Sequence, residues 1–319
     1  MLAQANAGRL PFADRSVDLV IGSPPYVDSR LYLEDGEDIG IARGCREWVD
    51  WMLRVTDEAL RVSRGLVLWV CAGKTSDWCY QPAPEGLLWE WWKQGGECHL
   101  FRPCYWHRVG IPGSGHGTWY RADVEYVLAF KRPGPVSYGE PTANGHPPKY
   151  APGGEMSYRL SDGTRKDQWG GNAGSGTHRK RDGTRDSGVR PSHKIHTKRA
   201  ANGSMREQSY VPPVLANPGN LFSVPVGGGK LGSKLAHENE APYPVAVPAW
   251  FINSHCPPGG TVLDPFCGSG TTLQAAAELG RKGIGVDLRM SQCRIAKRRM
   301  RSVTPGFQFA VNNDAGEVG

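Results

Sequence analysis

The sequence predicts an α/β fold, a mostly parallel sheet covered by helices, interrupted by a basic and loop-rich insert. One observation predicts the fold: short apolar runs alternate with helical patterns near both ends of the chain, and strands separated by helices are typical of parallel sheets. A second observation predicts the insert. The periodicity is lost between about residues 134 and 235, where Gly, Pro, Ser, Lys, Arg and His accumulate.

Residues 1–133 form the first region. Its apolar runs are short and end at loop signals, so we expect buried strands. Its longer apolar patterns recur at helical spacing, so we expect amphipathic helices. The expected strands are 17–22, 66–70 and 124–130, and the expected helices are 48–62 and 87–95.

Residues 236–319 return to the same alternation. The expected strands are 261–264 and 283–287, and the expected helices are 271–279 and 291–300. From about residue 312 the chain has the composition of a loose tail. We therefore expect a divided α/β domain, 1–133 and 236–319, with residues 134–235 inserted between its halves.

Composition narrows the functional class. No run of about 18 apolar residues and no secretory signal pattern is present, so we expect a protein without a membrane partner. The eight cysteines form no CxxC pair, which favours a reducing cytoplasm over a disulfide framework or zinc site. The histidines His178, His193 and His196 have no second ligand cluster beside them, so we expect no metal site.

The positive charge is confined to one segment. The chain has a formal net charge of +7 and a pI of about 9.0. Between Arg159 and Arg206 there are twelve Lys or Arg and four Asp, a net of +8, so the remainder sums to −1. Such a segment is either a flexible, solvated linker or an electrostatic footprint for a phosphate backbone.

A first motif joins the expected strand 261–264 to the helix that follows. It reads Asp264-Pro265-Phe266-Cys267-Gly268-Ser269-Gly270-Thr271-Thr272. Small residues let the backbone approach a ligand closely, and the helix N-terminus presents free amides. Asp287 ends the next strand, where a carboxylate can accept ribose hydroxyls. A dinucleotide-binding fingerprint would require a third glycine where this chain has Thr-Thr-Leu.

A second motif, Ser23-Pro24-Pro25-Tyr26, follows the expected strand 17–22. Pro-Pro pairs are common in structural turns. At the carboxyl edge of an open sheet, however, such a loop lies where ligands bind. The serine oxygen and a backbone carbonyl can accept both hydrogens of an amino group, and the tyrosine ring can stack on a base.

Together these motifs resemble those of DNA amino-methyltransferases. The first is similar to the family's S-adenosylmethionine-binding pattern D-P-F-x-G-S-G-T-T, and the second to its catalytic [DNS]-P-P-[YFW] motif. The resemblance implies an AdoMet-dependent methyltransferase fold and transfer to N4 of cytosine or N6 of adenine in DNA. The catalytic residues would be Ser23, Pro24, Pro25 and Tyr26, and the cofactor residues would be Asp264, Pro265, Phe266, Gly268, Ser269, Gly270, Thr271, Thr272 and Asp287.

The order of the motifs resembles the beta class of this family, a circular permutation of the common Rossmann-like methyltransferase fold. In that class the target-recognition region lies between the two motifs, where this chain has its basic insert. One departure is Asn6, which stands where the family usually has an acidic residue contacting the cofactor adenine. Asn can still hydrogen-bond the adenine, with weaker expected affinity.

Transfer to an exocyclic nitrogen needs no covalent nucleophile, since orientation and electrostatics suffice. Cys104 and Cys256 superficially suggest a carbon-methylating enzyme, but neither has that family's surroundings, and we read Cys104 as an ordinary thiol. Serine at the first catalytic position is commoner among enzymes acting on N4 of cytosine. We therefore expect cytosine, with N6 of adenine as the alternative.

Double-stranded DNA is the expected partner, with the target base extruded into the pocket. Basic side chains of the insert would contact phosphates and base edges; the candidates are Arg179, Lys180, Arg181 and Arg185. Homodimers occur in this class, and a cognate restriction endonuclease can accompany it. We expect a cytoplasmic enzyme encoded by a bacterium or phage.

Two further hypotheses remain open. An enzyme of the same fold could act on RNA or protein amino groups, although the permuted motif order and basic insert favour duplex DNA. A DNA-binding protein with an inactive methyltransferase fold is the non-enzymatic alternative. The intact Ser-Pro-Pro-Tyr motif and Asp264 argue against it.

Overall fold

The computed structural model describes most of the chain outside the basic segment. Described are residues 1–27, 44–95, 102–110, 118, 120–147, 214–227, 230–238 and 242–303, and the backbone of the strands at 33–34, 37–38, 195–199 and 205–209. The chain divides into two compact units, residues 1–144 with 219–319, and residues 145–218. Each unit is described by itself.

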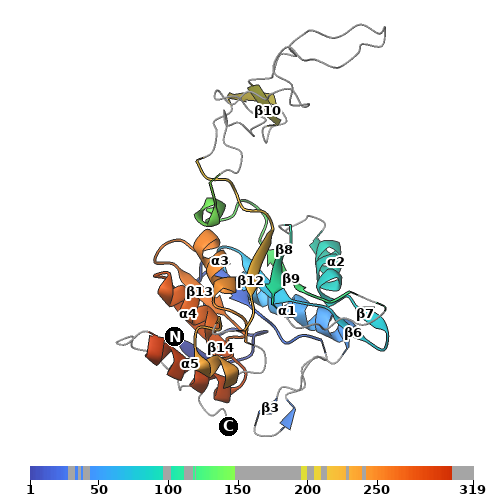
Figure 1. Ribbon diagram of the computed structural model, residues 1–319, viewed down its shortest axis with the longest axis vertical. Helices are drawn as coiled ribbons and strands as arrows, with labels where there is room; N and C mark the ends of the chain where they lie inside the picture. Colours follow the sequence, from blue (N-terminus) through green and yellow to red (C-terminus); the bar gives the residue numbers. More distant parts are fainter. Residues whose placement is uncertain are drawn as a thin grey trace. The chain divides into compact units, whose positions relative to one another are not determined.

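An eight-stranded sheet forms the centre of the first unit, in the order β1-β14-β13-β2-β5-β9-β8-β12 (Figure 1). The strands are β1 (Leu2–Gln4), β2 (Leu19–Gly22), β5 (Val67–Cys71), β8 (Cys104–Val109), β9 (Val124–Phe130), β12 (Leu221–Pro225), β13 (Thr261–Asp264) and β14 (Lys282–Asp287). The short strands outside this sheet are β3 (Leu33–Glu34), β4 (Glu37–Asp38), β6 (Lys74–Ser76) and β7 (Cys79–Gln81).

Five helices accompany the sheet in the described part of the chain. They are α1 (Cys45–Val62), α2 (Ala83–Gly95), α3 (Ala246–His255), α4 (Thr271–Glu278) and α5 (Met290–Val303), with two short 3₁₀ helices, η1 (Pro141–Asn144) and η2 (Lys234–Glu238). The α/β prediction is confirmed, and each helix and strand expected from an apolar pattern is present within a few residues of its expected bounds. None of the helices in the described ranges is both long and apolar enough to span a membrane.

The expectation of a parallel sheet is correct for one half of it. β1, β14, β13, β2 and β5 run parallel, but β9 runs antiparallel to both of its neighbours, β5 and β8. An antiparallel strand needs no helical crossover on each side, so spacing along the sequence does not reveal its direction. The reversal places the start of β9, and not its end, at the edge where the parallel strands finish.

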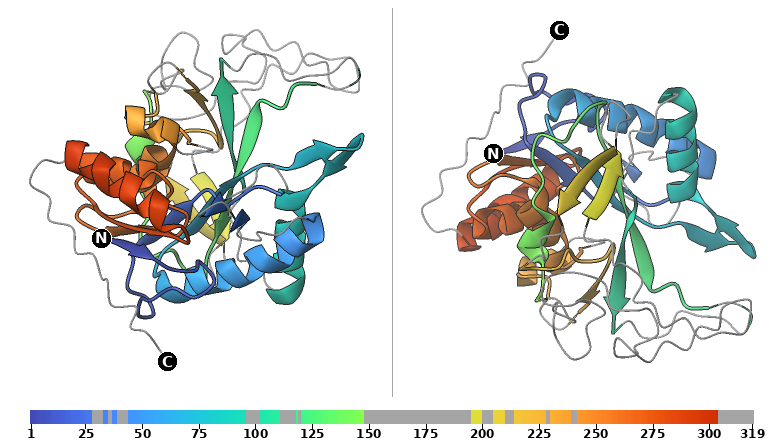
Figure 2. Two further views of the ribbon diagram at one scale, coloured as in Figure 1. Left: turned by 90° about the horizontal axis from the view of Figure 1, so that it is seen from below. Right: turned by 90° about the horizontal axis from the view of Figure 1, so that it is seen from above.

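Helices cover both faces of the sheet, because the central strands are apolar on both sides. Val20, Val67 and Trp69 face a core that includes α1 and α2. Leu19 and Leu68 face the opposite core, which includes α3 and α4, and α5 packs beside α4 against β1 and β14. Figures 1 and 2 show α1 and α2 on one side of the sheet and α3, α4 and α5 on the other.

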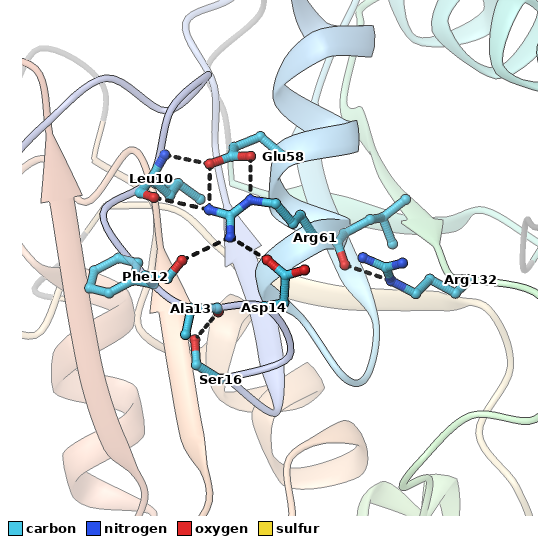
Figure 3. A network of polar contacts seen from close by, with 9 residues as sticks. Leu10, Phe12, Ala13, Asp14, Ser16, Glu58, Arg61 and Arg132 are labelled. Carbon is cyan, nitrogen blue, oxygen red and sulfur yellow. Dashed lines mark hydrogen bonds and ion pairs between the residues drawn. The ribbon is translucent and has the colours of Figure 1, made fainter.

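A network around Arg61 of α1 anchors the loop between β1 and β2 (Figure 3). The Arg61 guanidinium pairs with Glu58 at 2.8 Å and with Asp14 at 2.6 Å. It also donates to the carbonyl oxygens of Phe12 (2.9 Å) and Leu10 (3.0 Å). The interactions with Glu58, the largest cause, and with Asp14 raise the pKa of Arg61. The loop that carries the chain from β1 to β2 is therefore fixed to α1.

The second unit contains the antiparallel pair β10 (Ile195–Arg199) and β11 (Met205–Ser209). Its two ends also pair with each other. His146 N donates to the Ala216 carbonyl at 3.4 Å, and Ala216 N donates to the His146 carbonyl at 2.8 Å. The chain therefore enters and leaves this unit through two segments that lie side by side.

Candidate active site

The two sequence motifs meet at one edge of the sheet. β13 pairs in parallel with both β2 and β14, so all three strands end at the same edge. Ser23 follows β2, while Asp264 and Asp287 are the last residues of β13 and β14. The carboxyl edge of an open α/β sheet is where such folds bind ligands.

Gly22 brings the two motifs into contact. A Cβ atom added to Gly22 would lie 2.6 Å from Oδ1 of Asp264 and 3.4 Å from Cδ of Pro265. No side chain fits in that space, so the residue before Ser23 must be glycine for β2 to lie this close to the other loop.

Asp264 is 1% exposed, and both of its carboxylate oxygens accept hydrogen bonds. Oδ1 accepts from the Phe266 amide at 2.9 Å, and Oδ2 accepts from the Thr272 hydroxyl. The Thr272 hydroxyl also bonds the hydroxyl of Tyr243. Burial raises the pKa of Asp264 to about 7, although both hydrogen bonds oppose the shift. Asp264 thus closes the loop on the first turn of α4.

The glycine loop turns through two left-handed residues, Gly268 (φ 46°) and Gly270 (φ 84°). The Gly268 amide donates to Oδ2 of Asp287 at 3.0 Å, and the Arg289 amide donates to Oδ1 at 3.0 Å. A Cβ on Gly270 would lie 3.1 Å from the Cβ of Ala296 in α5. Glycine is required here by the backbone conformation and by the close helix.

Arg299 of α5 supports the same loop from behind. Its side chain is fully buried, and its guanidinium donates to Thr271 Oγ1 (2.8 Å), Ser269 Oγ (3.2 Å) and Gln274 Oε1 (2.8 Å). Burial lowers the pKa of Arg299 to about 10. Arg299 could not be singled out from the sequence, because it is one of several basic residues in the helix.

Phe266 connects the loop to the core under α1. Its ring packs edge-on against Trp51 and Trp69, with centroids 5.7 and 5.8 Å apart. The Asp-Pro-Phe segment is therefore anchored on one side of the sheet, while Thr271 and Thr272 begin a helix on the other.

Three residues outside the Ser-Pro-Pro-Tyr loop hold it in place. Trp48 of α1 donates from its indole nitrogen to the Pro25 carbonyl at 2.6 Å. The Tyr26 hydroxyl donates to Oε2 of Glu125 at 2.6 Å, and Nη1 of Arg108 binds Oε1 of the same carboxylate at 2.9 Å. The sequence does not identify Glu125 as a site residue, because its partners Tyr26 and Arg108 are distant or unremarkable in sequence; the one available signal is an acidic residue inside an apolar strand pattern.

Burial is the largest cause of a raised pKa at both Tyr26 and Glu125. Burial, followed by the adjacent Glu125 charge, raises the pKa of Tyr26 well above its usual value. Burial also raises the pKa of Glu125, opposed by the bonds from Tyr26 and Arg108. Ser23 completes the group, since its hydroxyl donates to the Tyr26 oxygen over 3.5 Å.

Asn6 lies two residues beyond the end of β1. β1 pairs in parallel with β14, with Gln4 opposite Asp287, so Asn6 lies at the same edge of the sheet. The side chain is exposed, and its oxygen accepts a hydrogen bond from the Gly8 amide at 2.8 Å.

Other predicted residues lie elsewhere. Arg179, Lys180, Arg181 and Arg185 fall outside the described residues, as do the side chains of His178, His193 and His196. Cys104 is a half-buried thiol on β8, and burial raises its pKa. The described residues bring together no three His, Cys, Asp or Glu side chains that could hold a metal ion.

Comparison with known proteins identifies relatives along most of the chain. The model of the N6/N4 methyltransferase family, described as DNA methylase, matches residues 17–298. The orphan methyltransferase M.BamHII of Bacillus amyloliquefaciens is 27% identical over 296 residues, covering 91% of this chain and 90% of its own. The type II methyltransferase M.ScaI of Streptomyces caespitosus is 34% identical over 92 residues, covering 28% of this chain and 30% of its own.

Two solved structures share the fold. TTHA0409 of Thermus thermophilus, a proposed DNA modification methylase in complex with S-adenosyl-L-methionine, superposes with a TM-score of 0.56 at 21% identity, covering 99% of each chain. The cytosine-N4-specific PvuII DNA methyltransferase superposes with a TM-score of 0.55 at 16% identity, covering 96% of this chain and 87% of that one. The permuted methyltransferase fold expected from the motif order is confirmed.

Proposed function

Because this chain belongs to the N6/N4 DNA methylase family, we propose that it transfers a methyl group from S-adenosylmethionine to N4 of a cytosine in duplex DNA. One observation carries the proposal: Gly22 packs against Asp264, so the amino-group motif and the glycine loop share one sheet edge. A nucleoside-type ligand held by one loop would thus lie next to a base held by the other.

The residues of the glycine loop are suited to S-adenosylmethionine. Gly268 and Gly270 have no side chains to obstruct a ligand, the side chain of Ser269 between them is buried against Arg299, and the amides at the start of α4 can bind polar atoms. Asp287 already accepts two backbone amides, but a carboxylate has about four acceptor positions and can also bind ribose hydroxyls. We assign Asn6 to the adenine. The cofactor supplies a methyl group on a sulfonium, which is a good electrophile.

The Ser-Pro-Pro-Tyr loop would bind and orient the target base. We assign one amino hydrogen to Ser23 Oγ and the other to the Pro24 carbonyl, since the Pro25 carbonyl already accepts from Trp48. Both bonds would increase electron density on the nitrogen and aim its lone pair at the methyl carbon. As the N–C bond forms, the C–S bond would break to leave S-adenosylhomocysteine, and the methylated nitrogen would release one proton to solvent. Tyr26 would stack on the extruded base. Orientation and electrostatics then supply the catalysis, with no covalent intermediate.

Cytosine is favoured over adenine by Ser23 at the first motif position. The fold is also shared with a cytosine-N4-specific enzyme. Both amino groups present the same two hydrogens, so adenine N6 is the second possible product of a methyl-transfer experiment.

We assign DNA binding to the basic segment between the motifs. Its net charge of +8 suits a phosphate backbone, and Arg179, Lys180, Arg181 and Arg185 are our candidate contacts. These contacts would offset the cost of extruding the base, which is a few kcal/mol.

The test is transfer of labelled methyl from S-adenosylmethionine to unmethylated duplex DNA, followed by digestion to nucleosides. We expect N4-methylcytosine; N6-methyladenine would correct the base and keep the reaction. Ser23→Ala should lower transfer at least tenfold through the lost amino-group bond. Ser16→Ala is the matched control, because that hydroxyl bonds the Ala13 carbonyl before β2 begins. Cofactor binding without DNA labelling would contradict the proposal and favour an RNA or protein substrate.

A further inference from the structure

A directed series of hydrogen bonds runs from Ser23 to an ion pair whose carboxylate is buried. The Ser23 hydroxyl donates to the Tyr26 oxygen (3.5 Å), and the Tyr26 hydroxyl donates to Glu125 Oε2 (2.6 Å). The other oxygen of Glu125 accepts from Arg108 Nη1 at 2.9 Å. Glu125 is 6% exposed. This series of hydrogen bonds therefore begins at Ser23, the expected acceptor for the amino group, and ends on the Glu125 carboxylate, which is shielded from water.

The chemistry of the Glu125 carboxylate decides which hydroxyl donates and which accepts in each of these hydrogen bonds. A carboxylate paired with a guanidinium only accepts hydrogen bonds, so the Tyr26 hydroxyl must donate to it. The tyrosine oxygen then has lone pairs to offer, and the Ser23 hydrogen points toward it. A serine hydroxyl has one hydrogen and two acceptor positions, so fixing the hydrogen leaves those positions for the substrate.

We propose that Glu125, acting through the Tyr26 hydroxyl, is a positioning residue that turns the Ser23 hydroxyl into an acceptor for the target amino group. The inference rests on the proposed function and adds a role for the tyrosine hydroxyl beyond stacking by its ring. Without this direction the serine hydroxyl could rotate and donate to the attacking nitrogen, which would occupy the lone pair needed for the reaction.

The order and direction of the strands bring Glu125 close to Tyr26. β9 runs antiparallel to β5, and β5 lies beside β2. Glu125, the second residue of β9, therefore lies at the edge where β2 ends and Ser23 follows. The distance of 3.5 Å from Ser23 to Tyr26 is long for a hydroxyl pair, but catalytic hydrogen bonds commonly tighten when substrate binds.

The first experiment compares Tyr26→Phe with the wild-type protein in single-turnover methyl transfer. The ring stays, so DNA affinity and AdoMet affinity should change little, while the transfer rate falls about tenfold because one hydrogen bond is lost. Tyr126→Phe is the matched control. Its hydroxyl also bonds a carboxylate, Glu85 at 2.8 Å, but that pair is not linked to Ser23. We expect the wild-type rate from this control.

A second variant tests whether Glu125 acts through the tyrosine. Glu125→Gln removes the charge and keeps the shape, and we expect a comparable fall in transfer rate. In the Tyr26→Phe background the same change should have little further effect, because the hydroxyl it acts through is absent. Two independent, multiplying losses would overturn the inference.

A rescue experiment separates hydroxyl direction from a general structural role. In Ser23→Asn the side-chain oxygen accepts hydrogen bonds and carries no hydrogen that needs direction. Tyr26→Phe should therefore lower the transfer rate about tenfold in the wild-type background and only slightly in the Ser23→Asn background. The inference would be overturned by an equal loss of transfer rate in both backgrounds, or by no activity in Ser23→Asn. In either case, methyl transfer by the wild-type protein would still support the proposed function. No wild-type transfer to DNA would overturn both.

Discussion

Asp264 is a carboxyl group whose charge depends on its burial. The pKa is raised from 3.8 to about 7, since burial outweighs the bonds from Thr272 and Phe266. The folded protein therefore holds the proton more tightly than the unfolded chain. The resulting stabilisation is complete below the unfolded pKa and is lost as the pH rises through about 7.

Asp264→Asn should remove this pH dependence, because the amide stays neutral. The free energy of unfolding of the wild type, minus that of the variant, should fall by on the order of 2 kcal/mol between about pH 5 and pH 7. Urea unfolding at a series of pH values measures it. A constant difference would mean that Asp264 is ionised throughout that range.

At the scale of elements, α1 fixes the Ser-Pro-Pro-Tyr loop through one indole. Trp48→Phe removes the bond to the Pro25 carbonyl and leaves a small cavity, since Trp48 is fully buried. We expect a loss of about 2 kcal/mol in stability, and slower methyl transfer because the loop is less well held.

Trp106→Phe is the control for this prediction. Trp106 is also buried, and its indole also donates to a carbonyl, that of Val224 at 3.0 Å. Trp106→Phe should lose about as much stability as Trp48→Phe. Its rate of methyl transfer should equal that of the wild type when both are compared at the same concentration of folded protein. Equal effects on transfer would show that α1 has no special role in holding the loop.

Helix α5 supports the glycine loop, our proposed cofactor site, through Arg299. Arg299→Met leaves several buried acceptors without their donor, among them Ser269 and Thr271. We expect about 3 kcal/mol of destabilisation and weaker AdoMet binding by calorimetry. Arg298→Met is the matched control on the same helix, because its partner Glu238 is exposed and such pairs contribute about 1 kcal/mol or less. AdoMet affinity unaffected by Arg299→Met would contradict this role.

The strands and helices with strong periodicity could be predicted from the sequence, as could both motif loops. β8 and β12 could not, because Tyr105, His107 and Ser223 interrupt any apolar pattern on strands near the sheet edge. β1 has three residues, too few to show a period. The supporting residues Glu125, Arg108 and Arg299 were missed for a different reason: their roles come from partners distant in sequence.

At the scale of the whole molecule, residues 145–218 form an insertion with adjacent ends. Because His146 and Ala216 pair with each other, a short Gly-Ser linker can replace residues 147–215. We expect this deletion variant to bind AdoMet like the wild type, since the residues proposed to bind the cofactor all belong to the first unit.

The same deletion should abolish specific DNA binding. The slope of log affinity against log salt should decrease by about 0.9 for each phosphate that the variant no longer neutralises. Fluorescence anisotropy of a labelled duplex at several salt concentrations measures both effects. DNA affinity equal to that of the wild type would contradict the assignment of DNA binding to this segment.

The pairing of β2 with β13 has a consequence for synthesis of the protein. Leu19 lies opposite Val262 in the middle of the sheet, a separation of about 240 residues. At about 5–20 residues per second, a ribosome needs roughly 12–50 seconds to make the second strand after the first. During that interval β2 has one unpaired apolar edge, and such edges promote aggregation. In the nascent chain, that edge of β2 therefore stays unpaired until β13 emerges from the ribosome.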